Sequence, residues 1–296
     1  MGHKKQQNTL CLSIADASIS VTAEKTDRRF RIDGALRSFI GAYRVQAPDI
    51  DLTLHYGKIP RYPVEELIFE DRLRKVTFYR SNGCYIVRTP FRLLAGDVDF
   101  SRGDLYIRPQ SPIIFLRYPL QHPLDKILML TLFSRKQAAV MHACGVDYRG
   151  QGLLFVGNSN AGKSTMARLW KKHGAGQKKK RDFTVLNDDR IVIRKVQKKF
   201  WIYGTPWHGD ARLYSPKKVP LRRIFFLRHS QANALRKTDY LDSVLRLVSC
   251  SLAARWHKQG IASCLDICAE LAGKTTPCEF SFLPDKSALE FIKNEV

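Results

Sequence analysis

The sequence predicts an α/β protein in which a β-rich N-terminal domain, residues 1–120, precedes an α/β C-terminal domain, residues 121–296. Residues 10–115 contain short runs of β-branched and aromatic residues in partial alternation, which is typical of strands. After residue 120, helix-length segments alternate with strand-like ones. The segment 153–156 is apolar throughout, as expected for a strand covered on both faces.

In the N-terminal domain we expect short strands joined by turns. Residues 81–83 read Ser-Asn-Gly, which predicts a hairpin because Asn and Gly accept positive φ at little cost. Residues 101–104, Ser-Arg-Gly-Asp, predict a second turn. The domain contains no recognisable chemistry, so we expect it to cover or complete the second domain. The segments that we expect to form its strands are 10–23, 49–57, 75–90, 98–109 and 111–119.

The C-terminal domain begins with a helix from Pro123 and a strand over 138–148, then a tight turn at 149–152 and the apolar strand 153–156. The amphipathic segment 164–174 follows as a helix that stops at a glycine. The remaining expected elements are a strand at 183–186, helices at 239–257 and 261–273, a strand at 278–284 and a last helix at 285–296.

The strongest motif follows the apolar strand and matches G-x-x-x-x-G-K-[ST]. Its glycines would let backbone N–H groups converge on a phosphate chain, and the N-terminus of the next helix adds partial positive charge. The lysine supplies a mobile cation, and the serine hydroxyl is a ligand for magnesium. The residues predicted to bind the nucleotide are Gly157, Asn158, Ser159, Asn160, Ala161, Gly162, Lys163, Ser164 and Thr165.

Two adjacent acids, Asp188 and Asp189, end the strand predicted at 183–186. Magnesium needs an acidic ligand besides a hydroxyl, so one carboxylate would bind the metal with Ser164. The other could accept the proton of an incoming hydroxyl, and the sequence leaves open which aspartate does which. A doubled acid beside the γ-phosphate favours transfer to a hydroxyl over hydrolysis.

His142 lies 15 residues before Gly157, on the strand that a short turn joins to the apolar strand. A hairpin of this length brings His142 back alongside the predicted phosphate-binding loop. A lone histidine on an apolar strand is often structural, so the position of this one relative to the loop makes it a candidate.

These motifs together resemble the C-terminal domain of HPr serine kinase/phosphorylase and its HPr-kinase-like relatives, which share a P-loop fold with ATP-dependent phosphoenolpyruvate carboxykinase. The resemblance covers about residues 123–230 well. It rests on the order of the histidine segment 142–146, the strand 152–157, the loop 161–165 and the segment 187–190, Asn-Asp-Asp-Arg.

The resemblance implies ATP-dependent phosphorylation of a serine hydroxyl on a peptide or protein. Lys163 and Ser164 would hold the nucleotide and Mg²⁺, Asp188 and Asp189 would supply metal binding and the base, and His142 would lie beside the transferred phosphate.

The chain departs from HPr kinase itself, because no E-x-R-G-x-G-like stretch follows the aspartate pair. Residues 203–210 look instead like the G-T-P-x-H-G-[DE] segment of HPr-kinase-like proteins found with peptide-modifying systems, such as lasso-peptide kinases. His208 and Asp210 are therefore candidates to face substrate or metal. Arg212 could stabilise transferred phosphate charge. Whether HPr is the acceptor, and whether a reverse phosphorylase reaction exists, stay open.

The charge balance points to a polyanionic partner. Fifty Lys and Arg against 27 Asp and Glu give a net charge of +23, with a basic run at 178–181. We find no zinc finger, RNP-type strand or basic zipper. Seven thinly spread cysteines, no signal segment and no apolar span predict a cytoplasmic protein without a membrane span. Cys264 and Cys268 could share a zinc ion, but packed core thiols explain them as well.

We therefore expect an ATP- and Mg²⁺-dependent kinase that acts on a peptide or protein hydroxyl; an acidic acceptor would suit the basic charge. The alternatives are a P-loop ATPase that acts with nucleic acid or another polyanion, a small-molecule hydroxyl kinase, and a nucleotide-binding sensor or scaffold without catalysis. The sequence leaves open an oligomeric assembly and the choice between ATP and GTP.

Overall fold

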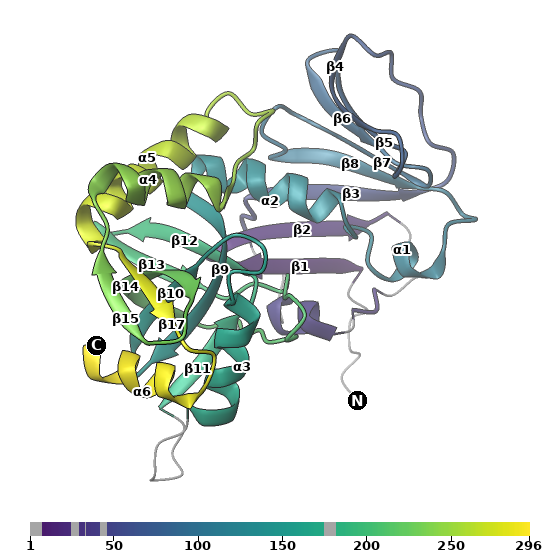
Figure 1. The fold of residues 1–296 in the computed structure, drawn as a ribbon. Helices are drawn as coiled ribbons and strands as arrows, with labels where there is room; N and C mark the ends of the chain where they lie inside the picture. Colours follow the sequence, from purple (N-terminus) through teal and green to yellow (C-terminus); the bar gives the residue numbers. More distant parts are fainter. Residues whose placement is uncertain (1–7, 25–29, 33, 42–45, 175–181) are drawn as a thin grey trace, which may run out of the picture. The chain divides into compact units, whose positions relative to one another are not determined.

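The computed structural model describes residues 8–24, 30–32, 34–41, 46–174 and 182–296, so the basic run at 178–181 lies outside the described residues. The chain divides into two compact units. Unit 1 comprises residues 1–132 and 254–258, and unit 2 comprises residues 133–253 and 259–296. Each unit contains one large mixed sheet together with helices, which makes the chain mixed α/β (Figure 1).

Unit 1 is built on an eight-stranded sheet in the order β1-β2-β3-β8-β7-β6-β5-β4. The central pairs β2–β3 and β3–β8 are parallel, and the other pairs are antiparallel. Its strands are β1 (Thr9–Ile14), β2 (Ala17–Ala23), β3 (Ile50–Tyr56), β4 (Glu66–Asp71), β5 (Val76–Ser81), β6 (Cys84–Arg88), β7 (Arg92–Gly96) and β8 (Arg102–Ile107). The helical segments are η1 (Gly34–Phe39), α1 (Ile113–Arg117) and α2 (Leu124–Arg135), within which the division between the units falls.

The predicted Asn-Gly hairpin is present, whereas two other expectations for this unit were wrong. Asn82 and Gly83 both have positive φ, at 50° and 73°, between the paired strands β5 and β6. Residues 102–104 lie in β8 instead of a turn, because the Asp97 carboxylate accepts the N–H groups of residues 99, 101 and 102 and so places the turn earlier. Ile113–Arg117 form the helix α1 and not a strand.

A buried arginine explains why unit 1 extends beyond the predicted boundary at residue 120. The Arg92 side chain is 2% exposed and donates hydrogen bonds to the carbonyl oxygens of Pro119, Gln121 and His122. The guanidinium also lies 4.1 Å from the ring centroid of Phe115. These contacts tie the segment that precedes α2 to strand β7.

The short segment 254–258 belongs to unit 1 although unit 2 surrounds it in sequence. The Trp256 indole N–H donates to Thr131 Oγ1 at 2.8 Å. The next residue, His257, lies 2.9 Å from a carboxylate oxygen of Asp99. Such long-range side-chain contacts leave no periodic signal in the sequence.

Unit 2 carries a nine-stranded sheet whose pairings close on themselves, because β10 pairs with both β9 and β14. The long strands β9 and β14 each change partners along their length. The strands are β9 (Ala138–Tyr148), β10 (Gln151–Val156), β11 (Phe183–Asn187), β12 (Arg190–Val196), β13 (Lys199–Tyr203), β14 (Lys218–His229), β15 (Ala234–Lys237), β16 (Ser251–Leu252) and β17 (Cys278–Phe282). The helices are α3 (Lys163–His173), α4 (Tyr240–Ser249), α5 (Gly260–Thr275) and α6 (Lys286–Glu295).

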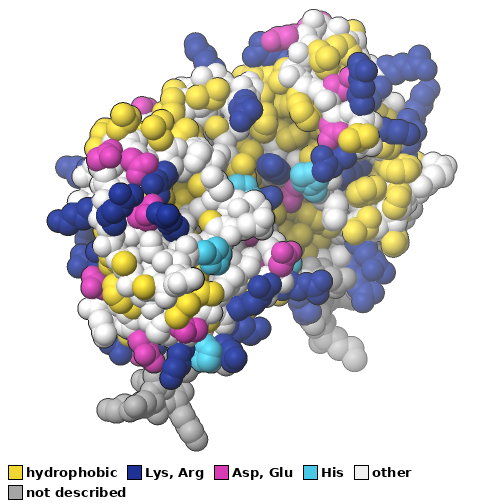
Figure 2. Space-filling model, in the orientation of Figure 1, with side chains coloured by type: hydrophobic (Ala, Val, Ile, Leu, Met, Phe, Trp, Pro, Cys, Tyr) yellow, Lys and Arg dark blue, Asp and Glu magenta, His cyan; other side chains and the backbone are white. Residues whose placement is uncertain are grey.

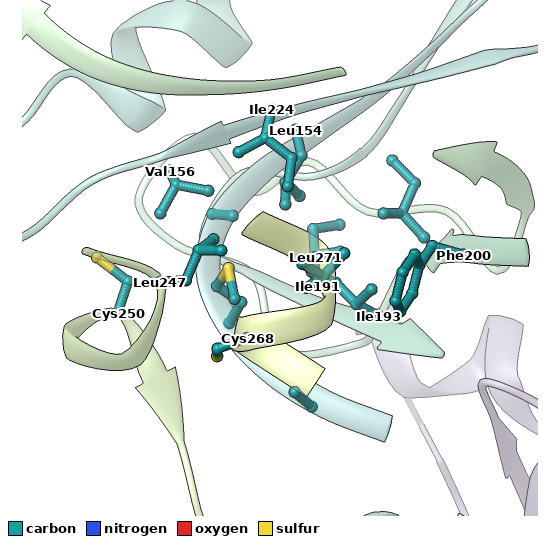
Figure 3. Packing of buried hydrophobic residues seen from close by; sticks show 14 of the residues in the cluster. Leu154, Val156, Ile191, Ile193, Phe200, Ile224, Leu247, Cys250, Cys268 and Leu271 are labelled. Carbon is teal, nitrogen blue, oxygen red and sulfur yellow. The ribbon is translucent and has the colours of Figure 1, made fainter. Parts of the chain in front are cut away.

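Strand β10 is buried on both faces, as its apolar sequence predicts. Leu154 and Val156 join a core that includes side chains of α4 and α5. Leu153 and Phe155 join the opposite core with α3 and α6. Figure 3 shows the first core, in which side chains from β10, β12, β13 and α5 meet.

The helix predicted over 239–257 ends early. Helix α4 stops at Ser249, and Ser251–Leu252 form β16, which pairs with β9. The chain therefore turns at Cys250, whose carbonyl accepts the His142 N–H at 2.7 Å.

Basic side chains are widespread on the visible surface, where dark-blue Lys and Arg outnumber the acids (Figure 2). Among the described residues, no helix combines the length and apolarity needed to cross a lipid bilayer.

Replacing Arg92 with alanine should destabilise unit 1. Three buried carbonyl oxygens would lose their donor, so we expect the free energy of unfolding to fall by about 3 kcal/mol or more. Urea unfolding followed by tryptophan fluorescence measures this. Exposed Arg72 is the matched control, and its alanine variant should change stability by less than about 0.5 kcal/mol. Equal stability of the two variants would contradict the role assigned to Arg92.

Candidate functional site

The 157–162 loop connects buried strand β10 to helix α3. Its last glycine is required by the backbone, because Gly162 has φ of 101° and a Cβ there would lie 2.6 Å from the Phe282 ring. At the start of the loop, a Cβ on Gly157 would lie 2.5 Å from that of Ala161. The middle residues Asn158, Ser159 and Asn160 are exposed. The loop therefore makes a tight turn that leaves its outer edge open.

Lys163 begins α3 and folds back over this loop. Its side chain is 8% exposed, and Nζ donates to the carbonyl oxygens of Gly157 at 2.7 Å and Asn158 at 2.8 Å. Burial lowers the pKa of Lys163, and the negative charge of Asp189 opposes this lowering. The ammonium group is thus held between the loop and the aspartate.

Strand pairing places His142 beside the loop, as the hairpin predicts. Ala143 on β9 pairs with Val156 at the end of β10, so the preceding residue lies next to the start of the loop. On its other side His142 pairs with Arg190 at the start of β12. Strand β9 therefore brings this histidine to both the loop and the β11–β12 turn.

An asparagine that the sequence reasoning missed shapes the β11–β12 turn. Asn187 is fully buried, and its Oδ1 accepts the N–H groups of Asp189 and Arg190 at 2.7 and 2.8 Å. Its Nδ2 donates to the carbonyl oxygen of Thr205 at 2.8 Å. The sequence does contain a signal for this turn, because asparagine favours turns and Asn187 stands at a strand end, immediately before two acids.

The two adjacent aspartates have different environments. Asp188 is fully buried, and its carboxylate accepts the N–H groups of Gly209, Ala211 and Leu213 at 3.0, 2.8 and 3.3 Å. It therefore anchors the 209–213 segment. We expected one acid to bind the metal ion and the other to act as the base, but the partners of Asp188 are backbone amides.

Asp189 faces the loop instead. Its Oδ1 lies 3.4 Å from His142 Nδ1, and its Oδ2 lies 3.5 Å from Arg190 Nε. The hydrogen bond from His142 is the main reason that the pKa of Asp189 lies below its usual value, and burial works in the opposite direction. Asp189 is thus a carboxylate at neutral pH, next to an imidazole and near an ammonium group.

These groups line one cavity of about 540 Å³. It combines the loop and the start of α3 with His142 and Asp189, so most of the predicted site comes together. Of the predicted residues, Gly157, Ala161, Asp188, His208 and Arg212 do not line it. The lining residues are His142, Asn158, Ser159, Asn160, Gly162, Lys163, Ser164, Thr165, Arg168, Asp189, Gly209, Asp210, His229, Ser249 and Cys250.

The predicted 208–212 candidates separate in the structure. Asp210 is exposed and lines the cavity. His208 stacks on Tyr214, with ring centroids 5.6 Å apart, and contacts the Gly209 carbonyl oxygen. Arg212 is exposed, with φ of 52°. Among the three candidates, only Asp210 is placed to meet a ligand in the cavity.

Five lining residues were not among the predicted site residues: Arg168, Gly209, His229, Ser249 and Cys250. Arg168 lies one turn beyond Ser164 on α3. His229 ends β14, which runs parallel to β10, and the carboxyl ends of neighbouring parallel strands meet at one edge. The apolar run before His229 is visible in the sequence, but the parallel pairing that brings His229 to the cavity is not. Cys250 donates its S–H to Asn158 Oδ1 at 3.4 Å, and burial raises its pKa, which keeps the thiol protonated.

The donor set in the cavity fits magnesium. Magnesium prefers oxygen ligands and keeps several waters, so a hydroxyl and one carboxylate suffice from the protein. Ser164 and Asp189 supply these. Within the described ranges, the cavity included, no group of three or more His, Cys, Asp or Glu side chains is arranged to hold a metal ion. Cys264 and Cys268 lie in the core as buried thiols.

Comparison with known proteins assigns no family: the sequence matches no protein-family model and no curated protein. The chemistry of the cavity is therefore derived from its own residues.

Removing Asp188 should loosen the segment that it anchors. In Asp188→Ala the amides of Gly209, Ala211 and Leu213 lose their acceptor, which should cost about 3 kcal/mol or more. Hydrogen exchange should show faster exchange at these amides. The exposed neighbour Asp210 is the control, and Asp210→Ala should leave their protection unchanged. Unchanged exchange in Asp188→Ala would contradict the anchoring role.

Replacing His142 with alanine should raise the pKa of Asp189, because the largest cause of its lowering is removed. The folded-state pKa lies below the unfolded value. The stabilising contribution of Asp189 is therefore present at neutral pH and lost as the pH falls through the folded pKa. The His142 variant should show less of this acid-dependent loss.

Carboxyl-carbon NMR titration measures the Asp189 pKa directly. His208→Ala is the control, since His208 makes no contact with Asp189 in the described structure and its removal should leave the titration unchanged. An Asp189 pKa that is the same with and without His142 would show that their hydrogen bond does not form in solution.

Proposed function

We propose that the protein is an ATP- and Mg²⁺-dependent phosphotransferase of the HPr-kinase-like P-loop type, which transfers the γ-phosphoryl group to a hydroxyl, that of serine, on a peptide or protein. The observation that carries the proposal is one cavity that joins Lys163 and Ser164 to the bonded pair His142–Asp189. Support also comes from the match of residues 157–165 to the phosphate-binding motif and from the resemblance in the order of the motifs.

The loop side of the cavity suits a chain of phosphates. Helix α3 has 11 residues and directs its N-terminus at the loop, where its partial positive charge favours an anion. Lys163 would exchange its loop carbonyls for β- and γ-phosphate oxygens. Arg168 adds a second cation on the same helix. The volume of about 540 Å³ lies in the range of ordinary ligand pockets.

Ser164 and Asp189 would hold the magnesium ion, which when bound neutralises phosphate charge and orients the transferred group. Asp188 would contribute from outside the cavity, because its hydrogen bonds fix the turn that presents Asp189. The structure thus favours unequal roles for the two acids.

His142, whose Nδ1 faces the Asp189 carboxylate, would take up the proton of the acceptor hydroxyl on its other ring nitrogen. In the transfer, the acceptor oxygen forms a bond to the γ-phosphorus while the bond from that phosphorus to the β,γ-bridging oxygen breaks, and ADP leaves. His142 lies against the carboxylate and limits its rotation. Lys163 and Arg168 would stabilise charge on the transferred phosphoryl oxygens.

Substituting Lys163 with alanine or Asp189 with asparagine should lower phosphoryl transfer by on the order of 10²-fold or more, since each removes a charge that acts on the phosphates or metal. The assay follows γ-³²P-labelled ATP with Mg²⁺ and serine-containing peptides, acidic and neutral. Lys172→Ala on the exposed side of α3 and Asp266→Asn on α5 are charge-matched controls that should keep full activity.

The same assay distinguishes other functions. Labelled phosphate released in response to DNA or RNA, without a labelled peptide, would replace the proposal with a nucleic-acid-dependent ATPase. ATP binding without turnover on any acceptor would indicate a sensor. Labelling of small alcohols alone would indicate a small-molecule kinase. Undiminished peptide labelling in both variants would remove the catalytic assignment.

A further inference from the structure

Unit 1 contains a second candidate site, far in sequence from the 157–165 motif. A cavity of about 230 Å³ is lined by Ile59, Pro60, Arg61, Arg88, Thr89 and Arg108. Its polar lining is dominated by the three arginines, and none of the described residues that line it is acidic. A small cavity walled by several guanidinium groups is suited to an anion.

The topology of the sheet brings two of these arginines together. Strands β6 and β8 both pair antiparallel with β7, so they run in the same direction and end at the same edge. Arg88 is the last residue of β6, and Arg108 follows the last residue of β8. Arg61 comes from the connection between β3 and β4. The rigid sheet therefore fixes two of the three positions.

The three arginines lack an anionic partner among the residues that the structure describes. Within the described part of the chain, none of the three side chains forms an ion pair or hydrogen bond. Arg88 Nε is shielded from solvent and lacks an acceptor. The charge of Arg88 is thus uncompensated where its side chain lines the cavity, so an anion in the cavity would be stabilising. Elsewhere in unit 1, by contrast, Arg72, Arg74 and Arg80 each pair with an acid.

We propose that this cavity binds a phosphate dianion, free or as a monoester. Three cations favour a doubly charged group over a carboxylate, and guanidinium forks match phosphate oxygens. The volume of about 230 Å³ lies below that of ordinary ligand pockets, so it suits a phosphate group and not a whole nucleotide. The guanidinium groups of Arg61, Arg88 and Arg108 would donate to its oxygens. The inference is independent of the proposed function.

The test follows the Arg88 Nε–Hε signal by NMR in the full-length Lys163→Ala variant, so that phosphate bound at the 157–165 loop does not contribute. Millimolar inorganic phosphate and O-phosphoserine should both shift this signal saturably, and the same concentration of acetate should not. Saturation by phosphate alone would identify the free ion as the ligand, and saturation by both would identify the phosphate group as the recognised unit. No shift, or an equal shift with acetate, would overturn the proposal.

A second test measures the affinity for inorganic phosphate by calorimetry. Arg88→Gln should weaken phosphate binding roughly tenfold or more, because charged hydrogen bonds of this kind contribute at least that much. Arg61→Gln and Arg108→Gln remove exposed side chains, so they should lower affinity without disturbing the fold. Arg72→Gln removes the same charge from the β4–β5 side of the sheet and should leave affinity unchanged. Equal losses of phosphate affinity in Arg72→Gln and Arg108→Gln would show that only the overall charge of the protein matters, and this would overturn the proposal.

Discussion

The candidate site in unit 2 depends on the way strand β9 changes its partner strands along its length. Residues 138–142 pair with β12, and residues 143–148 pair with β10 and β11. His142 lies where the strand changes partners, next to the end of β10 on one side and the start of β12 on the other. Backbone ladders are rigid, so the distance between the loop and the Asp189 turn is set by the pairing of β9 with β10 and β12.

A second constraint keeps the acidic turn in place. Asn187 and Asp188 are fully buried polar side chains, and the side-chain oxygens of both accept hydrogen bonds from backbone N–H groups. Gly209 fits against this turn because a Cβ would lie 3.0 Å from Asp188 Oδ2 and from Asp189 Cβ. One acid thus organises the backbone so that its neighbour can face the cavity, which explains why two adjacent residues of one type differ so strongly in exposure.

Local patterns in the sequence predicted much of the fold. The apolar strand β10, the glycine-rich loop and helix α3 are each encoded by neighbouring residues, as is the hairpin at Asn82 and Gly83. Features that depend on distant partners were not readable. Arg92 extends unit 1 through carbonyls some 30 residues away, and the helix expected over 239–257 stops where Ser251 pairs with Met141.

The same distinction holds for the site. The loop, His142 and Asp189 follow from motif and spacing, but His229 reaches the cavity only through the parallel pairing of β14 with β10. The differing roles of the two aspartates depend on three amides that lie 21 to 25 residues further along the chain. Because the two acids are adjacent in the sequence, both are expected near the site. The backbone of the 209–213 segment binds Asp188, and this leaves Asp189 to face the cavity.

The position of Lys163 has a consequence for selectivity. Its ammonium group already has two carbonyl oxygens as acceptors, at 2.7 and 2.8 Å, so it is satisfied before any anion arrives. In the proposed function, a nucleotide would have to replace both contacts, and the several oxygens of a polyphosphate chain would do so better than a singly charged ion such as chloride. The two carbonyl groups would then compete with weak anions for the ammonium group, which would favour polyphosphates in a chain of charge +23.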